Sequence, residues 1–307
     1  MVINFSFDIY PFYKIIRPLN CILSGIALFV GVLIIDPDLF NKELTIILLG
    51  ACCMIFVSAG GFVINDIFDI EIDKINKPER MLPSGRMSQK TAYFYTIFLF
   101  IIGVFLSIIA LFIKTDLSIG IIPPVLTIIG IISLIAYAKY LKKYGIFGNL
   151  LITLLSLVPI IITGYVINDL NRAFFPVFLG FLLMYTREII KDIEDIRADL
   201  AASSNSFFSL PAVIGLTPTV YLTRILLIFL IMSTFLPFTF HEFSFYASYS
   251  VGIFVILVDL LIIKILFELR ETEDNLILKA KQAKKEMKYG IIFGLLAFTL
   301  NPFTPLS

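Results

Sequence analysis

Histidine, cysteine and charged side chains are all scarce in this chain of 307 residues. The single histidine, His241, leaves a histidine-based catalytic mechanism almost no side chains to work with. Cys21, Cys52 and Cys53 lie in apolar runs without the spacing of a metal or disulfide pattern, so we expect them to be small buried apolar side chains. Charged residues make up 15% of the chain, whereas soluble domains have about a quarter. This composition excludes an ordinary soluble domain.

Hydrophobic residues, in contrast, make up 59% of the chain, and the mean hydropathy is +0.98. An apolar surface of this size cannot be buried in one soluble core, so lipid must solvate much of it. Nine apolar segments are each close to the ~20 residues that cross ~30 Å of hydrocarbon. They are Pro18–Ile35, Leu44–Asn65, Thr91–Ile113, Leu117–Ala138, Tyr144–Asn168, Ala173–Thr186, Ile225–Phe240, Phe243–Phe267 and Tyr289–Ser307. Because these runs are too long for barrel strands, the sequence predicts an all-α, polytopic membrane helix bundle of about nine transmembrane helices.

Basic residues are concentrated in alternate loops. The N-terminal stretch and the loops after the second, fourth, sixth and eighth segments carry most of them, and the other loops hold only Lys42, Lys114 and Arg172. Because loops rich in lysine and arginine stay in the cytoplasm, we expect a multi-pass protein of the cell membrane with a cytoplasmic N-terminus. Met1–Tyr13 lacks the features of a signal peptide and is expected to belong to the mature chain. The net charge of +1 gives no reason to expect nucleic acid as a partner.

Two acidic clusters occupy corresponding places in the chain. Both lie in long loops on the predicted cytoplasmic face, one after the second apolar segment and one after the sixth. Long loops on one face are where function tends to be placed, so we expect the active site to face the cytoplasm. Motif position alone predicts a single domain over residues 1–307. It has two four-helix halves, about 12–142 and 143–268, and a ninth helix at about 286–305.

The first cluster runs from Asn65 to Asp73. At about 100° per residue, Asn65, Asp69 and Asp73 fan over only ~80° of a helix, with Asp66 at the edge of this stripe. Glu71 points the other way. The first cluster therefore predicts a strip of oxygen ligands down one face of a helix.

The second cluster follows the sixth apolar segment. Glu188, Asp192, Asp195 and Asp199 lie within a stripe of about 60° on a helix, and Arg187 takes the opposite side. Carboxylates stacked one turn apart repel each other by a few tenths of a kcal/mol per pair. Two such stripes are therefore poorly suited to stability alone.

A hard divalent cation resolves this repulsion, and magnesium favours oxygen ligands, often shared with substrate phosphates. Two metals could hold a diphosphate from both sides. The alternative is that the acidic residues only decorate a solvated interface, but two clusters at matching points of two halves disfavour it. We therefore expect Mg²⁺, two ions, as the cofactor. The predicted metal ligands are Asn65, Asp66, Asp69, Asp73, Asp192, Asp195 and Asp199.

These motifs resemble the UbiA superfamily of intramembrane prenyltransferases. The matching stretches are Arg17-Pro18-Leu19-Asn20, Asn65 to Asp73, Lys77-Pro78-Glu79-Arg80, Pro83-Ser84-Gly85-Arg86, Tyr137 to Lys142, Gly148-Asn149 and Asp192 to Asp199. Met81 and Ala198 stand where the family usually has proline and glycine. The resemblance implies a nine-helix bundle, magnesium, and a prenyl diphosphate donor whose tail lies in a tunnel open to membrane lipid.

Among the subfamilies, Asn65–Ser88 and Arg187–Asp195 look most like the archaeal digeranylgeranylglyceryl phosphate synthases. That resemblance implies transfer of a geranylgeranyl group from its diphosphate to the free hydroxyl of geranylgeranylglyceryl phosphate, a lipid-like acceptor. The expected catalytic residues are Asn65, Asp69, Asp73, Asp192, Asp195 and Asp199. The expected substrate-binding residues are Arg17, Asn20, Lys77, Arg80, Arg86, Tyr137, Lys139, Lys142, Asn149 and Lys191. Fixed donors of this kind would stabilise charge on the leaving diphosphate, although topology signalling explains the basic residues equally well.

Two other interpretations stay open. The acceptor could be an aromatic ring, as in quinone or haem pathways, and a cation transporter with acidic sites is a more distant alternative. Transport sites belong near the bilayer midplane, whereas both clusters are expected at helix ends. The Asp-Gly-xx-Ala-Arg run of phosphatidyl-type alcohol transferases is absent. The sequence gives no indication of the oligomeric state.

Two further groups of charges have expected roles. Arg224 and Asp259 lie inside adjacent spans, where charges are usually paired, so they are predicted to meet. The last basic loop is expected to attract anionic headgroups. Its lysines are Lys279, Lys281, Lys284, Lys285 and Lys288.

Overall fold

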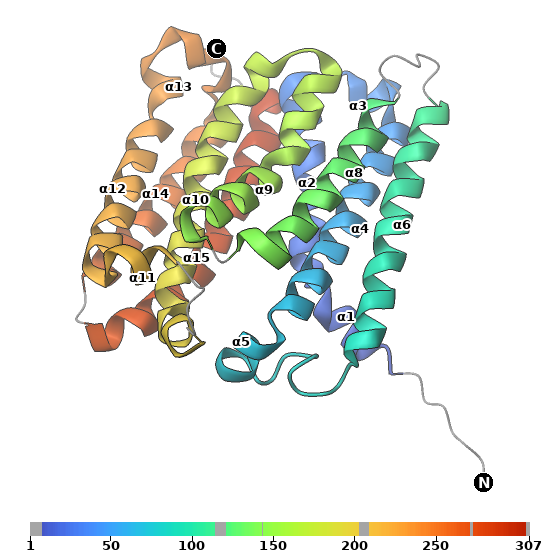
Figure 1. Cartoon of the computed structure of the whole chain (residues 1–307). Helices are drawn as coiled ribbons and strands as arrows, with labels where there is room; N and C mark the ends of the chain where they lie inside the picture. The colour runs from blue at the N-terminus through green and yellow to red at the C-terminus, as the bar shows by residue number, and fades with distance from the viewer. Residues whose placement is uncertain (1–7, 114–120, 143, 203–208, 271–272, 305–307) are drawn as a thin grey trace.

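The computed structural model describes residues 8–113, 121–142, 144–202, 209–270 and 273–304, without the side chains at 76, 198–199, 201–202 and 273–274. These ranges fold into helices joined by short turns, with no β-strand among them (Figure 1). The α-helices are α1 (Tyr10–Ile15), α2 (Pro18–Ile35), α3 (Leu39–Lys42), α4 (Leu44–Phe68), α5 (Ile70–Asn76), α6 (Gln89–Ile113), α8 (Ile122–Ala136), α9 (Gly145–Ile167), α10 (Leu170–Ala202), α11 (Leu210–Ile214), α12 (Leu216–Thr234), α13 (Leu236–Thr239), α14 (Tyr249–Glu268) and α15 (Glu273–Leu300). A π-helix, η1 (Tyr137–Leu141), follows α8, and two 3₁₀ turns are η2 (His241–Tyr246) and η3 (Asn301–Phe303).

Within the described ranges, eight helical segments are long and apolar enough to cross a membrane. They are α2, α4, α6, α8 with η1, α9, α10, α12 with α13, and α14. The prediction of a polytopic helix bundle is thereby confirmed. The ninth predicted segment, Tyr289–Ser307, supplies the second half of α15 with its residues up to Leu300, and its last three residues lie outside the described part of the chain. The first half of α15, up to Lys288, is rich in charge.

The outer surface of the bundle is apolar. On α6 the side chains of Phe94, Phe98, Ile101, Phe105 and Phe112 follow the three- and four-residue spacing of one helix face, and all are exposed, Phe112 by 82%. A continuous aromatic face of this kind is a liability in water. A lipid bilayer would cover it. These side chains therefore face hydrocarbon.

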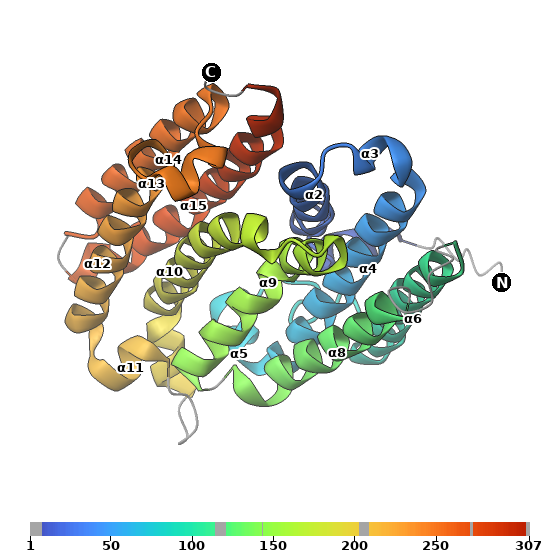
Figure 2. The same ribbon diagram turned by 90° about the horizontal axis from the view of Figure 1, so that it is seen from above.

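The interior packs in two main hydrophobic clusters. The larger joins α2, α9, α10, α12, α14 and α15, and the smaller joins α1, α2, α4, α6 and the loop after α5. Seen from above, α4, α6 and α8 stand on one side and α12, α14 and α15 on the other, with α2, α9 and α10 between them (Figure 2). The short helices α1, α5 and α11 lie at one end of the bundle, and α3 and α13 lie at the opposite end.

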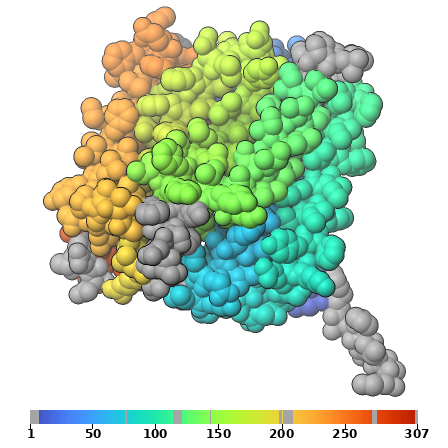
Figure 3. All heavy atoms as spheres, in the orientation of Figure 1, coloured from blue at the N-terminus to red at the C-terminus, as the bar shows by residue number. Residues whose placement is uncertain are grey.

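The end that carries α5 also carries both acidic clusters. In the space-filling view, residues of α5 and of the loop after it lie below the start of α9 (Figure 3). The basic first half of α15 reaches the same end. The polar residues of four separate chain segments are thereby brought together.

The predicted pairing of Arg224 with Asp259 is wrong. Asp259 accepts a hydrogen bond from the Thr234 hydroxyl at 3.0 Å instead. Thr234 lies ten residues beyond Arg224 on α12, which corresponds to roughly 15 Å along the helix axis. The two charges therefore lie at different depths of the bundle.

Candidate active site

The first acidic cluster spans a break between two helices. The helix α4 ends at Phe68, and Asp69 (φ −92°, ψ 0°) joins it to α5. The expectation of one continuous helix face is therefore wrong, because α5 turns away from the axis of α4 at the end of the bundle (Figure 1). Asp66, Asp69 and Asp73 nevertheless stay together, each at most 5% exposed. One guanidinium, that of Arg80, contacts both Asp66 (3.3 Å) and Asp73 (2.5 Å).

The loop after α5 holds this guanidinium in place. Its turn contains Gly85 at φ +73°, a left-handed conformation that glycine adopts without strain. The Met87 amide donates to the Met81 carbonyl at 3.0 Å, and both methionine side chains are buried in the smaller hydrophobic cluster. The Pro-Ser-Gly-Arg motif thus folds the loop back onto the core. Met81 supplies apolar packing there.

Arg17 approaches the cluster from α2. It lies in the left-handed region (φ 53°) between α1 and α2, and Pro18 begins the second of these helices. Such a backbone is strained for a residue with a side chain and is common at functional sites. The Arg17 side chain forms an ion pair with Asp66, and its guanidinium lies 5.0 Å from the Phe62 ring centroid.

The π-helix η1 brings a lysine to the same cluster. The Lys142 amide donates to the Tyr137 carbonyl at 2.9 Å, and the Lys142 ammonium pairs with Asp69. A Cβ at Gly148 would lie 2.8 Å from the Leu141 carbonyl oxygen, so only glycine permits α9 to begin this close. The next residue, Asn149, donates to Asp192 on α10 at 2.7 Å. The Gly-Asn motif therefore connects both acidic clusters.

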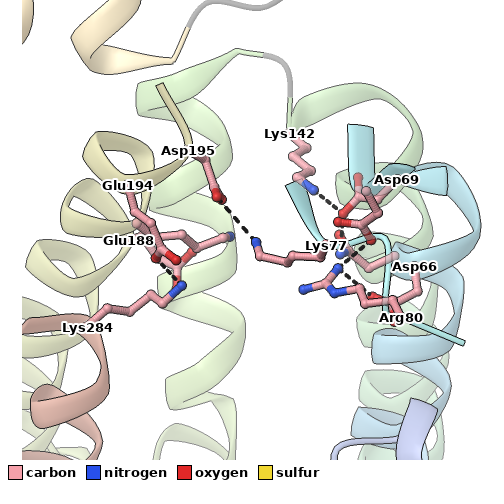
Figure 4. A network of polar contacts seen from close by, with 12 residues as sticks. Asp66, Asp69, Lys77, Arg80, Lys142, Glu188, Glu194, Asp195 and Lys284 are labelled. Atoms are coloured by element: carbon pink, nitrogen blue, oxygen red, sulfur yellow. Dashed lines mark hydrogen bonds and ion pairs between the residues drawn. The ribbon is translucent and has the colours of Figure 1, made fainter. Parts of the chain in front are cut away.

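The second cluster faces the first across one gap. Lys77, at the end of α5, donates to Asp195 on α10 at 3.3 Å, and Figure 4 shows its side chain reaching across from the side of Asp69. Glu188, also on α10, accepts from Lys191 at 3.0 Å and from Arg187 at 2.8 Å. The two clusters thus lie on either side of this gap, bridged by Lys77. The side chain of Asp199 lies outside the described residues.

The surroundings shift the pKa values of Asp69 and Asp73 in opposite directions. Burial raises the pKa of Asp69, but the charges of Lys142, Lys191 and Arg80 outweigh burial and bring its pKa below the ordinary value. Burial also raises the pKa of Asp73, and there the charge of Arg80 only partly offsets the effect. Asp69 is therefore held as a carboxylate.

The donor atoms suit a hard cation. Asp66, Asp69, Asp73, Asp192 and Asp195 offer only carboxylate oxygens, which magnesium prefers. Among the described residues, no three acidic, histidine or cysteine side chains gather closely enough to hold a metal in this arrangement. The carboxylates instead contact basic or amide side chains. The residues fit magnesium in type, and these contacts would have to be exchanged for it.

The site opens into a cavity of about 400 Å³ that runs between the helices. Of the predicted substrate-binding residues, Arg17, Asn20, Tyr137 and Lys191 line this cavity, as does the predicted metal ligand Asn65. Its walls are otherwise mostly apolar and come from α2, α4, α8, α9, α10, α12, α14 and α15. An elongated apolar ligand with an anionic end fits such a lining.

Some predicted site residues lie elsewhere. Arg86 and Lys139 are exposed, and Lys139 lies over the Tyr140 ring at 4.9 Å. Neither belongs to the cavity wall. Conversely, Arg187 and Lys288 line the cavity although sequence reasoning gave neither a role there. The four-residue spacing of Arg187 and Lys191 could have indicated that they share a helix face.

The fold and these side chains define an integral membrane protein that can hold an anionic, long-chain apolar substrate. Residues 23–276 match the model of the UbiA prenyltransferase family. The chain belongs to this family and is a prenyltransferase.

Two relatives match the chain over nearly its full length. The digeranylgeranylglyceryl phosphate synthase of Sulfurisphaera tokodaii is 32% identical, over 96% of this chain and 98% of that protein. A solved structure of a digeranylgeranylglyceryl phosphate synthase is 31% identical, covers 95% of this chain and 98% of its own, and has a TM-score of 0.65. A UbiA homologue from Archaeoglobus fulgidus, solved with GPP and Mg²⁺, shares the fold at 16% identity, with coverage of 94% and 99% and a TM-score of 0.61.

Proposed function

We propose that this protein transfers a geranylgeranyl group from geranylgeranyl diphosphate to the free hydroxyl of geranylgeranylglyceryl phosphate, with magnesium. The observation that carries the proposal is the pair of facing acidic clusters at the mouth of an apolar cavity, joined by the Lys77–Asp195 contact. The names of the relatives that are 31–32% identical support the choice of acceptor. The Archaeoglobus fulgidus homologue with GPP and Mg²⁺ supports the choice of donor class and metal.

In this proposal Asp66, Asp69, Asp73, Asp192 and Asp195 hold the metal, together with Asn65 and Asp199. Bound magnesium would neutralise charge on the leaving diphosphate. Lys77, Arg80, Lys142 and Lys191 would turn from their carboxylate partners to the diphosphate oxygens, because charge-assisted hydrogen bonds to phosphate are strong.

The chemistry then requires one exchange of bonds. The bond between the prenyl carbon and the diphosphate oxygen breaks, and the diphosphate keeps the electron pair. The acceptor hydroxyl oxygen forms the new bond to that carbon, and its proton is released. The predominantly apolar cavity wall would exclude water, which would otherwise compete with the acceptor. We further propose that this end of the bundle faces the cytoplasm, since the basic loops lie there.

Product analysis tests the proposal. Purified protein in liposomes receives geranylgeranyl diphosphate, Mg²⁺ and either geranylgeranylglyceryl phosphate or 4-hydroxybenzoate, and the lipid products are identified by mass spectrometry. We expect one new diether lipid, only with the glyceryl phosphate. Chelation of the metal should abolish it, and Mg²⁺ should restore it.

Two results would contradict the proposal. Product formed from 4-hydroxybenzoate alone would identify an aromatic acceptor instead. Diether formation that persists at the same rate in excess chelator would remove the role given to the acidic clusters.

A further inference from the structure

The helix α10 presents two different polar faces. Its carboxylate stripe, with Asp192 and Asp195, meets Asn149 and Lys77. Its other face lines the cavity with Pro176, Gly180, Leu183, Met184, Arg187 and Lys191. Arg187 therefore lines the cavity, next to Glu188.

A second cation reaches this part of the cavity from α15. Lys288 is partly buried in the cavity wall and has no carboxylate within ion-pair distance in the described part of the chain. One turn earlier on the same helix, Lys284 pairs with Glu194. Burial, together with the positive charges of Arg187 and Arg17, lowers the pKa of Lys288. Lys288 thus lies among like charges.

Arg187 also has unused hydrogen-bonding capacity. Its Nη1 donates to Glu188, but its buried Nε has no hydrogen-bond partner among the residues that the structure describes. Glu188 is the acid that balances Arg187, and it is shared with Lys191. Lys191 also lies near Asp69 and Asp192, whereas Lys288 is left without an acidic ion-pair partner in the described part of the chain. The uncompensated positive charge favours the binding of an anion.

The wall beyond these cations is apolar. On α15, Ile291, Leu295 and Phe298 follow Lys288 along the cavity, and Val255 and Val258 of α14 face the same space. On α2, α4 and α8, further apolar side chains such as Val57 and Leu134 line the same cavity, together with Asn65 and Tyr137. Apolar side chains from both sides of the bundle therefore line the cavity.

We propose that Arg187 and Lys288 bind the phosphate monoester of the acceptor lipid, whose hydrocarbon chain lies along α10, α14 and α15. This subsite rests on the proposed function. The carboxylate nearest to Arg187 is Glu188, which pairs with Arg187 and Lys191 and is not one of the proposed metal ligands. A guanidinium fork and an ammonium bind a phosphate monoester without metal. The wall of α2, α4 and α8 is then left for the donor chain.

Binding without turnover tests the subsite. Radiolabelled geranylgeranylglyceryl phosphate is titrated against the purified full-length protein in nanodiscs, in the absence of donor and divalent metal. We expect Lys288→Gln to weaken binding by about tenfold or more, since each charge-assisted contact is worth about that factor. Lys288→Arg should keep most of the affinity. The matched control is Lys285→Gln, which removes the same charge from an exposed position on the same helix.

Competitors distinguish the sources of the anion. A lipid phosphate monoester should displace the label, whereas geranylgeranylglycerol, which lacks the phosphate, and phosphatidylglycerol, a phosphodiester, should not. Displacement by inorganic phosphate alone at the concentration that suffices for the lipid would show that the hydrocarbon chain contributes nothing, which would overturn the lipid subsite.

Kinetics separates this inference from the proposed function. Lys288→Gln and Arg187→Gln should raise the KM for the acceptor and change the KM for the donor by less than about twofold. Equal binding of the label by Lys288→Gln and the unmodified protein, or a rise confined to the donor KM, would overturn the subsite. If the unmodified protein binds the label but forms no diether, the proposed function fails and the anion subsite stands.

Discussion

At the scale of single residues, Asp69 combines the burial, hydrogen bonding and electrostatics that characterise the site. It joins α4 to α5, accepts hydrogen bonds from Asn65 and Lys142, and is buried. Its pKa lies below the ordinary value despite burial, because Lys142 and further cations favour the ionised form. A buried carboxylate with several donors is well prepared to exchange one of them for a metal.

Replacing Asp69 by asparagine should therefore reduce kcat/KM by about 100-fold or more, because a pre-organised electrostatic contact is lost. The matched control is Glu71→Gln, two residues away, whose side chain is 82% exposed and pairs only with Lys74 in the described part of the chain. That variant should retain activity within about twofold. A similar loss of kcat/KM in both variants would show that the effect comes from disturbing α5 as a whole and not from Asp69 itself.

Spacing along the chain predicted which carboxylates form the two clusters, although the helix face expected for the first cluster is interrupted at Asp69. The structure brings Asp66, Asp69, Asp73, Asp192 and Asp195 to one end of the bundle. Their basic partners were harder to predict. A cytoplasmic lysine or arginine has two explanations, topology and binding, and sequence cannot separate them. For that reason Arg86 and Lys139 were expected at the site but are exposed, whereas Arg187 and Lys288 were missed.

At the scale of elements, hydropathy predicted which segments contact lipid better than it predicted where each helix begins and ends. The bounds of α2, Pro18–Ile35, are those expected, because both its ends coincide with a change in polarity. The helix α10 continues to Ala202, well beyond the predicted Thr186, and α15 begins at Glu273. Their polar turns pack on other helices rather than on lipid, which hydropathy does not detect.

The extended parts of α10 and α15 are joined by the ion pair of Glu194 with Lys284, whose side chains are 9% and 20% exposed. Breaking a mostly buried pair from one side leaves an uncompensated charge, so Lys284→Met or Glu194→Gln alone should destabilise the protein by about 3–5 kcal/mol. The double variant should recover part of this loss. Thermal unfolding in detergent measures the effect.

The pair of Lys264 with Glu286, whose side chains are 53% and 12% exposed, is the control for this cycle. Because Lys264 is exposed, removal of this pair should change the stability much less than removal of the Lys284–Glu194 pair. Additive losses at Lys284 and Glu194 would show that the two side chains are not coupled.

At the scale of the whole molecule, the acidic and basic side chains of the site come from two sides of the bundle and pair with one another. Carboxylates on α4, α5 and α10 are already matched by Arg17, Arg80, Lys142 and Lys77. A metal ion alone would have to displace these cations, whereas the diphosphate gives them a new partner. Metal and donor should therefore strengthen each other's binding.

This coupling can be measured as two affinities. The affinity for Mn²⁺, a spectroscopic substitute for Mg²⁺, should rise roughly 5- to 150-fold when geranylgeranyl diphosphate is present. The affinity for the donor should rise by the same factor when metal is present, because the coupling is reciprocal. An unchanged metal affinity would mean that the basic side chains do not compete with the ion.

The contact of Lys77 with Asp195 also bears on how the reaction ends. In the proposed reaction, both side chains would recover a partner when the pyrophosphate departs, so neither would be left as a lone, partly buried charge. The protein would thereby supply its own replacement for the departing product. Release of the pyrophosphate would become easier, so the loss of Lys77 would mainly slow the step that separates one catalytic cycle from the next.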